Sequence, residues 1–168
     1  MDSLWGNLDK PIINKSPRTI LQEQINYLNK MTDGSVEGEL IQNELHRLAN
    51  KETGDEYGYN FSYVFNLKSK FIKGFKYYIL SIAHDVIIYP LYIRINMDFA
   101  EKLKEHIMKE FADSDEFDEF DFEQHGEIFV ENETEYIKLL SVILKSEEVL
   151  NIISNIKLIV DEQIENLF

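Results

Sequence analysis

Residues 60–95 read NFSYVFNLKSKFIKGFKYYILSIAHDVIIYPLYIRI, and this stretch decides the fold. Aromatic and aliphatic residues alternate with polar ones over 61–68, which predicts a half-buried strand. A turn near Lys73 and Gly74 leads to a second strand over 75–83, and His84-Asp85 separates it from a third over about 87–95. Because these connections are short, we expect neighbouring strands to run antiparallel as a meander.

The flanks of this segment add one strand on either side. Residues 35–46 alternate and predict a strand, after which 49–58 form a polar loop with two glycines. The sequence GEIFVE, residues 126–131, predicts a further short strand.

Helical signals surround the strands. Ser16 and Pro17 are typical of a helix start, and we expect an amphipathic helix over 17–31. Asp98 is expected to cap a helix that carries an apolar stripe as far as Phe111. Asn132 and Glu135 form a capping box that opens a helix to about residue 144. Ser146 caps another helix, which runs to about residue 166.

The order of these elements predicts an α+β fold. We expect an antiparallel meander of about four to five strands, covered by an N-terminal helix and C-terminal helices. The chain has 168 residues with 44% hydrophobic side chains, which suits a single domain over 1–168. The last helix carries an apolar stripe at 4-3-4 spacing; it packs on the sheet or forms a short coiled coil, so the protein is a monomer or a homodimer.

Charge is the most uneven property of the sequence. The net charge is −14, and residues 110–135 hold 12 acidic side chains and no lysine or arginine. Within this region, 110–126 reads as an acidic connector. Phosphates would be repelled, so we expect no nucleic acid on this face. Concentrated negative charge steers basic partners instead.

Several classes of site and location are excluded or disfavoured. The absence of cysteine excludes disulfides, thiolate metal sites and cysteine nucleophiles. MDSLWGNLDK does not read as a secretory signal, and the ionic breaks in 75–95 disfavour a membrane span. We therefore expect a cytoplasmic protein without a membrane partner.

The acidic connector is the leading candidate site. Four interpretations stay open for it: a calcium loop, a mimic of nucleic acid, a docking surface for a basic protein, or a solvated connector whose phenylalanines pack on their own core. We expect partial order with some rings buried. The docking hypothesis assigns steering to the carboxylates and anchoring to the phenylalanines, and its residues are Asp115, Glu116, Phe117, Asp118, Glu119, Phe120 and Asp121.

Catalytic and metal motifs give weaker signals. His84-Asp85 offers a general base, but the sequence has no GxSxG, HExxH or P-loop motif, and a histidine in a strand turn is more often structural. The four histidines form no metal-ligand spacing. Lysines around 68–76 either grip a phosphate, protect a sheet edge, or attract the acidic connector. We expect no cofactor and no metal, and an enzyme is the less favoured interpretation.

The leading hypothesis is therefore a non-enzymatic interaction module of the immunity, inhibitor or defence-accessory type, which binds a basic protein. The alternative is a small-molecule or nucleotide-binding domain with a pocket over the aromatic sheet. That pocket would use tyrosines and polar groups, namely Tyr63, Tyr77, Tyr78, Tyr89, Tyr92, Lys76, His84 and Arg94.

The chain also resembles other proteins in three stretches: SPRTILQEQINYL, TDGSVEGEL and the meander that ends in HDVIIYPLYI. Over about 16–95 the chain resembles a loosely related set of small bacterial α+β proteins that have no assigned activity. The shared motifs are a helix cap, a turn and a strand start, so the resemblance implies a fold and no functional residue. The acidic connector is not part of it.

Overall fold

The computed structural model describes residues 3–6, 15–43, 46–49, 56–111, 113 and 119–167. In chain order the elements are α1 (Pro17–Met31), β1 (Glu37–Asn43), β2 (His46–Ala49), β3 (Glu56–Tyr59), β4 (Phe61–Lys68), β5 (Lys76–His84), β6 (Leu91–Ile95), α2 (Met97–Phe111), α3 (Glu119–His125), β7 (Glu127–Val130), α4 (Glu133–Leu144) and α5 (Glu147–Glu165).

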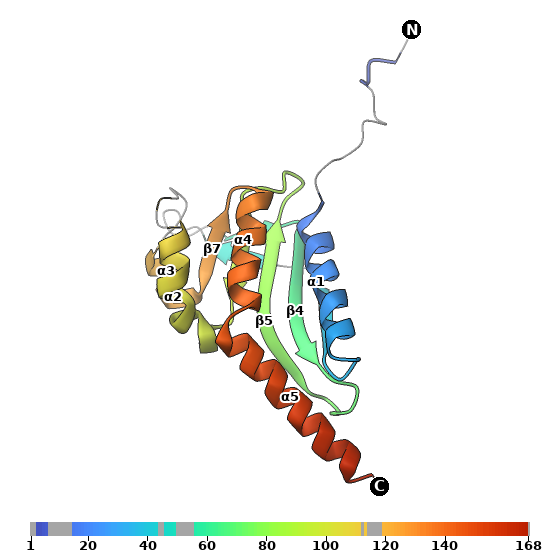
Figure 1. Cartoon of the computed structure of the whole chain (residues 1–168). Coiled ribbons are helices and arrows are strands. Elements are labelled where there is room, and N and C mark those ends of the chain that lie inside the picture. Colours follow the sequence, from blue (N-terminus) through green and yellow to red (C-terminus); the bar gives the residue numbers. More distant parts are fainter. Residues whose placement is uncertain are drawn as a thin grey trace.

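The centre of the molecule is a five-stranded antiparallel sheet in the order β1-β4-β5-β6-β7 (Figure 1). Each strand lies beside the next sheet strand in the sequence, so the predicted meander and the α+β fold are confirmed. The register of β4 against β5 shifts between Phe65 and Asn66, which marks a bulge. The remaining strands, β2 and β3, form a small separate sheet.

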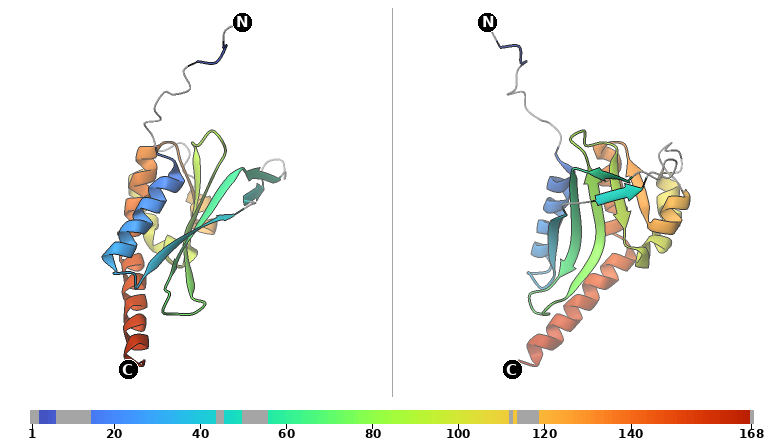
Figure 2. Two further views of the ribbon diagram at one scale, coloured as in Figure 1. Left: turned by 90° about the vertical axis from the view of Figure 1, so that its right-hand side faces the viewer. Right: turned by 180° about the vertical axis from the view of Figure 1, so that it is seen from behind.

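The two faces of the sheet are covered differently. Helices α1 and α4 lie on one face, and the β2–β3 pair lies toward the other (Figure 2). Residues that alternate toward the helices form the core, and Ile79, Ile82 and Ile93 are completely buried. This burial supplies most of the stabilisation of such a domain.

Helix starts are set by side-chain caps, as the sequence predicts. Ser16 Oγ accepts from Thr19 N at 3.2 Å, Asn132 Oδ1 accepts from Glu135 N at 2.9 Å, and Ser146 Oγ accepts from Val149 N at 3.3 Å. These bonds satisfy backbone donors that have no partner within the helix. The predicted starts of α1, α4 and α5 are therefore confirmed.

Helix α1 sits close to the sheet because β1 carries a glycine beneath it. A Cβ added at Gly38 would lie 2.7 Å from two side-chain carbons of Ile25 and 3.0 Å from Phe65 Cε2. Helix α4 is tied to the start of α1 by a buried bond, in which Tyr136 Oη donates to the Pro17 carbonyl at 3.2 Å. The two helices are thereby held side by side at the ends where both begin.

Four local expectations need correction. The polar loop over 49–58 contains the start of β3 rather than loop alone. Strand β6 begins at Leu91 and not near 87, after a cis bond between Tyr89 and Pro90. Asn96 Oδ1 accepts from Asp98 N at 2.9 Å, so Asn96 and not Asp98 precedes α2. The acidic connector contains a helix, α3, which has no consistent apolar period in the sequence.

Within the described part of the chain, no helix has the length and apolar character needed to cross a membrane.

Candidate functional site: an apolar groove between two helices

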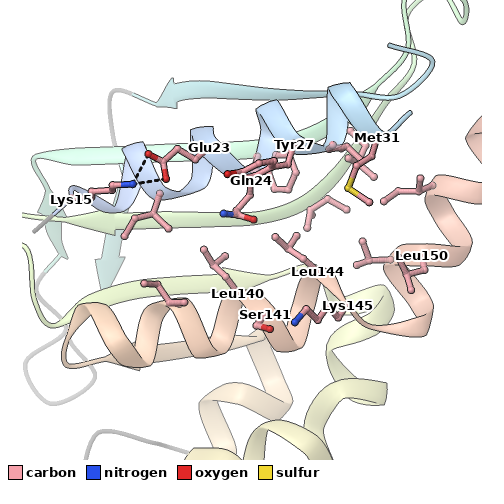
Figure 3. A pocket seen from close by; sticks show the side chains of 18 of the residues that line it. Lys15, Glu23, Gln24, Tyr27, Met31, Leu140, Ser141, Leu144, Lys145 and Leu150 are labelled. Carbon is pink, nitrogen blue, oxygen red and sulfur yellow. Dashed lines mark hydrogen bonds and ion pairs between the residues drawn. The ribbon is translucent and has the colours of Figure 1, made fainter. Parts of the chain in front are cut away.

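A groove of about 680 Å³ runs between α1 and α4 on the helix-covered face of the sheet (Figure 3). Its floor comes from β4 and β5, through Phe65, Leu67 and Ile79. One wall is α1, and the other is α4 followed by the start of α5. A cavity of this size falls in the range of roughly 300–1,000 Å³ that is typical of ligand pockets.

Large apolar side chains at the rim of this groove are exposed. Met31 and Tyr27 of α1 are 82% and 59% exposed, and Leu150 and Ile137 on the opposite wall are 51% and 48% exposed. Single exposed apolar residues are ordinary, but here four of them surround one concave surface. Burial of this rim is the largest apolar gain that the groove offers a ligand.

The end at which both helices begin is polar. Lys15 Nζ donates to the two carboxylate oxygens of Glu23 at 2.7 and 2.8 Å, and this carboxylate raises the pKa of the Lys15 ammonium. Across the groove, Glu133 is the first residue of α4, and its Oε2 is buried. Among the described residues this oxygen has no hydrogen-bond partner.

A second buried polar atom belongs to Tyr89, which is not among the residues that line the groove. Leu91 pairs with Val130, so the chain just before β6 runs beside the chain just after β7, which brings Tyr89 near the start of α4. Tyr89 Oη is buried, and the described part of the chain gives it no hydrogen-bond partner. Burial first, and the negative charge of Glu133 second, raise the pKa of Tyr89 to about 12. The phenol therefore keeps its proton at neutral pH.

The α4 wall also carries two polar residues farther along the groove. Ser141 and Lys145 line it, and Figure 3 shows them beside α4, while Leu140 and Leu144 extend toward α1. Lys145 is exposed, and no hydrogen bond or ion pair holds its ammonium among the described residues. Because water solvates this charge already, an anionic ligand would gain little from it.

The residues of the predicted acidic docking surface fall in two groups. Asp115, Glu116, Phe117 and Asp118 lie outside the described residues. Glu119, Phe120 and Asp121 lie in the first turn of α3. The acidic surface stays a prediction, because the structure describes less than half of it.

Several described side chains of α3 already make contacts with the rest of the domain. Lys104 of α2 forms ion pairs with Glu119, at 3.2 Å, and with Glu123. Phe122 is buried in the core together with Phe111, which confirms that some phenylalanine rings of the connector are buried. Among the described side chains, Lys104 ties α3 to α2 and the Phe122 ring ties it to the core.

The tyrosines of the predicted aromatic pocket are divided between the two faces of the sheet. Tyr63 faces α1, where the Arg18 guanidinium lies 5.8 Å from its ring centroid. Tyr92 lies on the other face, where its ring stacks on Tyr59 at 5.8 Å and meets Phe129 edge-on. Strand register places Tyr77 and His84 with Tyr63, and Lys76, Tyr78 and Arg94 with Tyr92.

His84 and the lysines have local partners. His84 is buried, stacks on Phe61 at 5.4 Å, and its Nδ1 lies 2.7 Å from the Asp85 carbonyl oxygen. The Asp85 carboxylate instead accepts from Asn60 N at 3.1 Å. Lys68 and Lys76 both pair with Glu39 of β1. Within the described ranges, no three His, Asp or Glu side chains gather in a way that would hold a metal ion.

Sequence reasoning did not predict the groove. One signal was present, because α4 carries Ile137, Leu140 and Leu144 while Ile143 and Leu139 already face the core. When the apolar surface of a helix is wider than packing on one sheet face requires, the extra width indicates a second contact. Which helix would face α4 across the groove depends on the tertiary structure.

Comparisons with known proteins found no match: no family model, no curated protein and no solved structure matches this chain.

Proposed function

We propose that the protein is a binding module for a small ligand with a straight apolar chain, which lies in the groove between α1 and α4. The observation that carries this proposal is the concave apolar surface of about 680 Å³, with its exposed rim. Helix α1 has 15 residues and is about 22 Å long, so an alkyl chain laid along it would contact the exposed rim side chains over many carbons.

The floor and the rim contribute in different ways. Phe65, Leu67 and Ile79 are fixed in the sheet and each exposes 3% of its surface or less, so they close the bottom of the groove and add little area for a ligand to cover. The rim residues are longer and more exposed, and they close over a chain once it has entered. Binding would therefore be driven by apolar area removed from water, at about 0.8 kcal/mol for each methylene.

A homologous series tests this proposal. We expect hexanol, octanol and decanol to bind with affinity that rises about fourfold for each methylene, because each adds the same apolar area. Isothermal titration calorimetry would give the dissociation constants. A flat series, or no binding by the longest chain, would contradict the groove as an alkyl site.

Two matched variants locate the binding. Ser141→Trp places a large ring from α4 into the groove and should abolish binding of decanol. Ser154→Trp makes the same change on an exposed position of α5 and should leave binding unchanged. Thermal unfolding of both variants checks that each is folded. Equal loss of binding in both would place the site elsewhere.

A further inference from the structure

The two edges of the central sheet are protected to different degrees. Strand β7 forms one edge with four residues, of which Ile128 and Val130 are buried. Strand β1 forms the other edge with seven residues, EGELIQN, all of them partly or fully exposed to water. An edge strand offers its outward N–H and C=O groups to another strand, and proteins usually block it with lysine, proline, a bulge or a covering element. Strand β1 contains no lysine, arginine or proline, and it pairs with β4 in one register over its whole length.

A hydrogen bond from β1 to α1 shows which backbone groups of β1 point away from β4. Gly38 N donates to Asn29 Oδ1 of α1 at 3.1 Å, so this N–H points out of the sheet edge. Alternate residues of an antiparallel strand direct their backbone groups to the same side, so those of Leu40 and Gln42 also point outward. Within the described part of the chain, no hydrogen bond to these outward groups of Leu40 and Gln42 is present. Asn29 covers one donor, and the edge is open from the Gly38 carbonyl to Gln42.

The side of α1 above this edge carries amides rather than charges. Asn26 and Gln22 stand one and two turns before Asn29, so the three side chains form a row along one side of the helix. Gln22 Nε2 donates to Asn26 Oδ1 at 3.2 Å within this row. The central parts of protein interfaces are depleted in charged residues. The row therefore extends the open edge into a surface that a second strand and its helix can cover.

The open edge is complementary to itself about Leu40. Two copies of β1 that are related by a two-fold axis at Leu40 pair antiparallel, and the two Leu40 residues exchange both of their backbone hydrogen bonds. Each Gln42 N–H then donates to the Gly38 carbonyl of the other copy, while the Gly38 N–H keeps its bond to Asn29. All the open groups between the Gly38 carbonyl and the Gln42 N–H gain a partner in this arrangement.

Charge favours the same register. With the axis at Leu40, each Glu39 lies opposite the uncharged Ile41 of the other copy. With the axis at Gly38, each Glu37 would lie opposite Glu39, and like charges directly opposite each other destabilise an antiparallel pair. That second register would also require the Gly38 N–H, which already bonds α1.

We infer that the partner of this edge is a second copy of the chain, which adds its β1 antiparallel across a two-fold axis at Leu40. The two five-stranded sheets then form one continuous sheet, with the two α1 helices side by side on the same face. In such strand addition, main-chain hydrogen bonds supply the affinity and the side chains set the specificity. The homodimer leaves the groove between α1 and α4 open, so this inference goes beyond the proposed function and does not depend on it.

Analytical ultracentrifugation of the full chain, from low-micromolar to high-micromolar concentration, tests for the dimer. We expect a reversible monomer–dimer equilibrium in the wild type. Gln42→Pro removes an outward N–H and spares the ladder between β1 and β4. It should raise the dimer dissociation constant about tenfold to a hundredfold, because one hydrogen bond is lost on each side of the axis. Gln42→Ala is the matched control: it removes the same side chain, keeps the N–H and should leave the dissociation constant unchanged.

Cross-linking tests the register, and the chain has no natural cysteine that would interfere. Leu40→Cys places two thiols on either side of the axis, where the Cα atoms of a hydrogen-bonded pair lie about 5.5 Å apart and a disulfide can form. Gln42→Cys places its two Cα atoms roughly 14 Å apart, which is too far for a disulfide. Under mild oxidation we expect a covalent dimer from Leu40→Cys and none from Gln42→Cys.

Each outcome supports or overturns the inference. A wild type that is monomeric at the highest concentration overturns it. A dimer that persists unweakened in a folded Gln42→Pro variant, as judged by thermal unfolding, places the interface elsewhere and also overturns it. If Gln42→Pro does not fold, the cysteine variants decide: equal cross-linking of both, or of neither, contradicts the register. Ser141→Trp should stay dimeric, which keeps this result separate from binding in the groove.

Discussion

The two faces of the central sheet are built on different principles. Toward the helices the strands present aliphatic and aromatic side chains that are almost completely buried, and Leu80, Ile82 and Ile93 have no exposed surface. On the other face, Glu39 lies between Lys68 and Lys76, and Arg94 Nη2 donates to Glu127 Oε1 at 2.6 Å. The face toward the helices is stabilised by burial throughout, whereas the other face combines buried residues such as Tyr92 with partly exposed ion pairs.

This difference explains where the candidate site lies. Burial on the helix side is incomplete between α1 and α4, and the uncovered area is apolar. An apolar ligand bound in the groove would remove this area from water. On the charged face, Lys68, Lys76 and Arg94 each already have a carboxylate partner. A ligand there would have to compete with ion pairs that the fold supplies.

Matched substitutions on the two faces should show the largest difference. Ile82→Ala opens a cavity in the core and should lower the free energy of unfolding by about 2–5 kcal/mol. Ile41→Ala makes the same change on β1, where strand register places the side chain on the charged face and 39% of it is exposed. We expect a loss below about 1 kcal/mol there.

Urea denaturation of both variants provides the measurement. The slope of unfolding against urea should be unchanged, so that the midpoint alone reports stability. A loss for Ile41→Ala that equals the loss for Ile82→Ala would mean that the charged face is buried in solution, and the comparison of the faces would be wrong.

Charge on the second face should have a smaller effect. Glu39 Oε2 forms an ion pair with Lys76 at 2.9 Å, and Glu39 Oε1 accepts from Lys68 at 3.4 Å. These interactions, with that to Lys76 first, lower the pKa of its carboxyl. We expect Glu39→Gln to cost about 0.2–1 kcal/mol at neutral pH, since the lysine side chains are partly exposed.

The sign of the pH dependence follows from the lowered pKa. The folded protein holds the Glu39 proton less tightly than the unfolded chain, so the stabilisation is complete above the ordinary pKa of glutamate. It is lost as the pH falls through the pKa of the folded state. Denaturation of wild type and Glu39→Gln from neutral to acidic pH should therefore show two curves that converge in acid. Curves that stay parallel would contradict the ion pairs.

The sequence predicts the fold well where a pattern is local. Alternation over 61–68 and the short turns determine the meander, and Ser16, Asn132 and Ser146 mark helix starts by chemistry that needs no distant contact. The predictions fail where a distant contact decides. Helix α3 depends on Lys104 and on the burial of Phe122, and neither can be read from the acidic segment itself.

The candidate site is harder to predict than the fold for the same reason. Its walls come from the two ends of the chain, and its floor comes from the middle. The acidic connector attracts notice because its composition is unusual, whereas the groove consists of ordinary leucines and isoleucines. Only their placement makes them a site.

The smallest effect is expected outside both faces, where Lys104 holds the two glutamates of α3. The carboxylates of Glu123 and Glu119, in that order, raise the pKa of the Lys104 ammonium by hydrogen bonding, but all three side chains contact water. Lys104→Met should lower the melting temperature slightly at low salt, less than Glu39→Gln, and not at all once salt screens the pairs.

Lys102→Met is the matched control for this substitution, since Lys102 is exposed on the same helix. It should have no effect at either salt concentration. A large loss for Lys104→Met that persists at high salt would mean that the lysine, rather than burial of Phe122, keeps α3 in place. Because a buried aromatic ring contributes far more than an exposed ion pair, we expect α3 to stay docked, with its acidic side chains freed from the lysine and its fold unchanged.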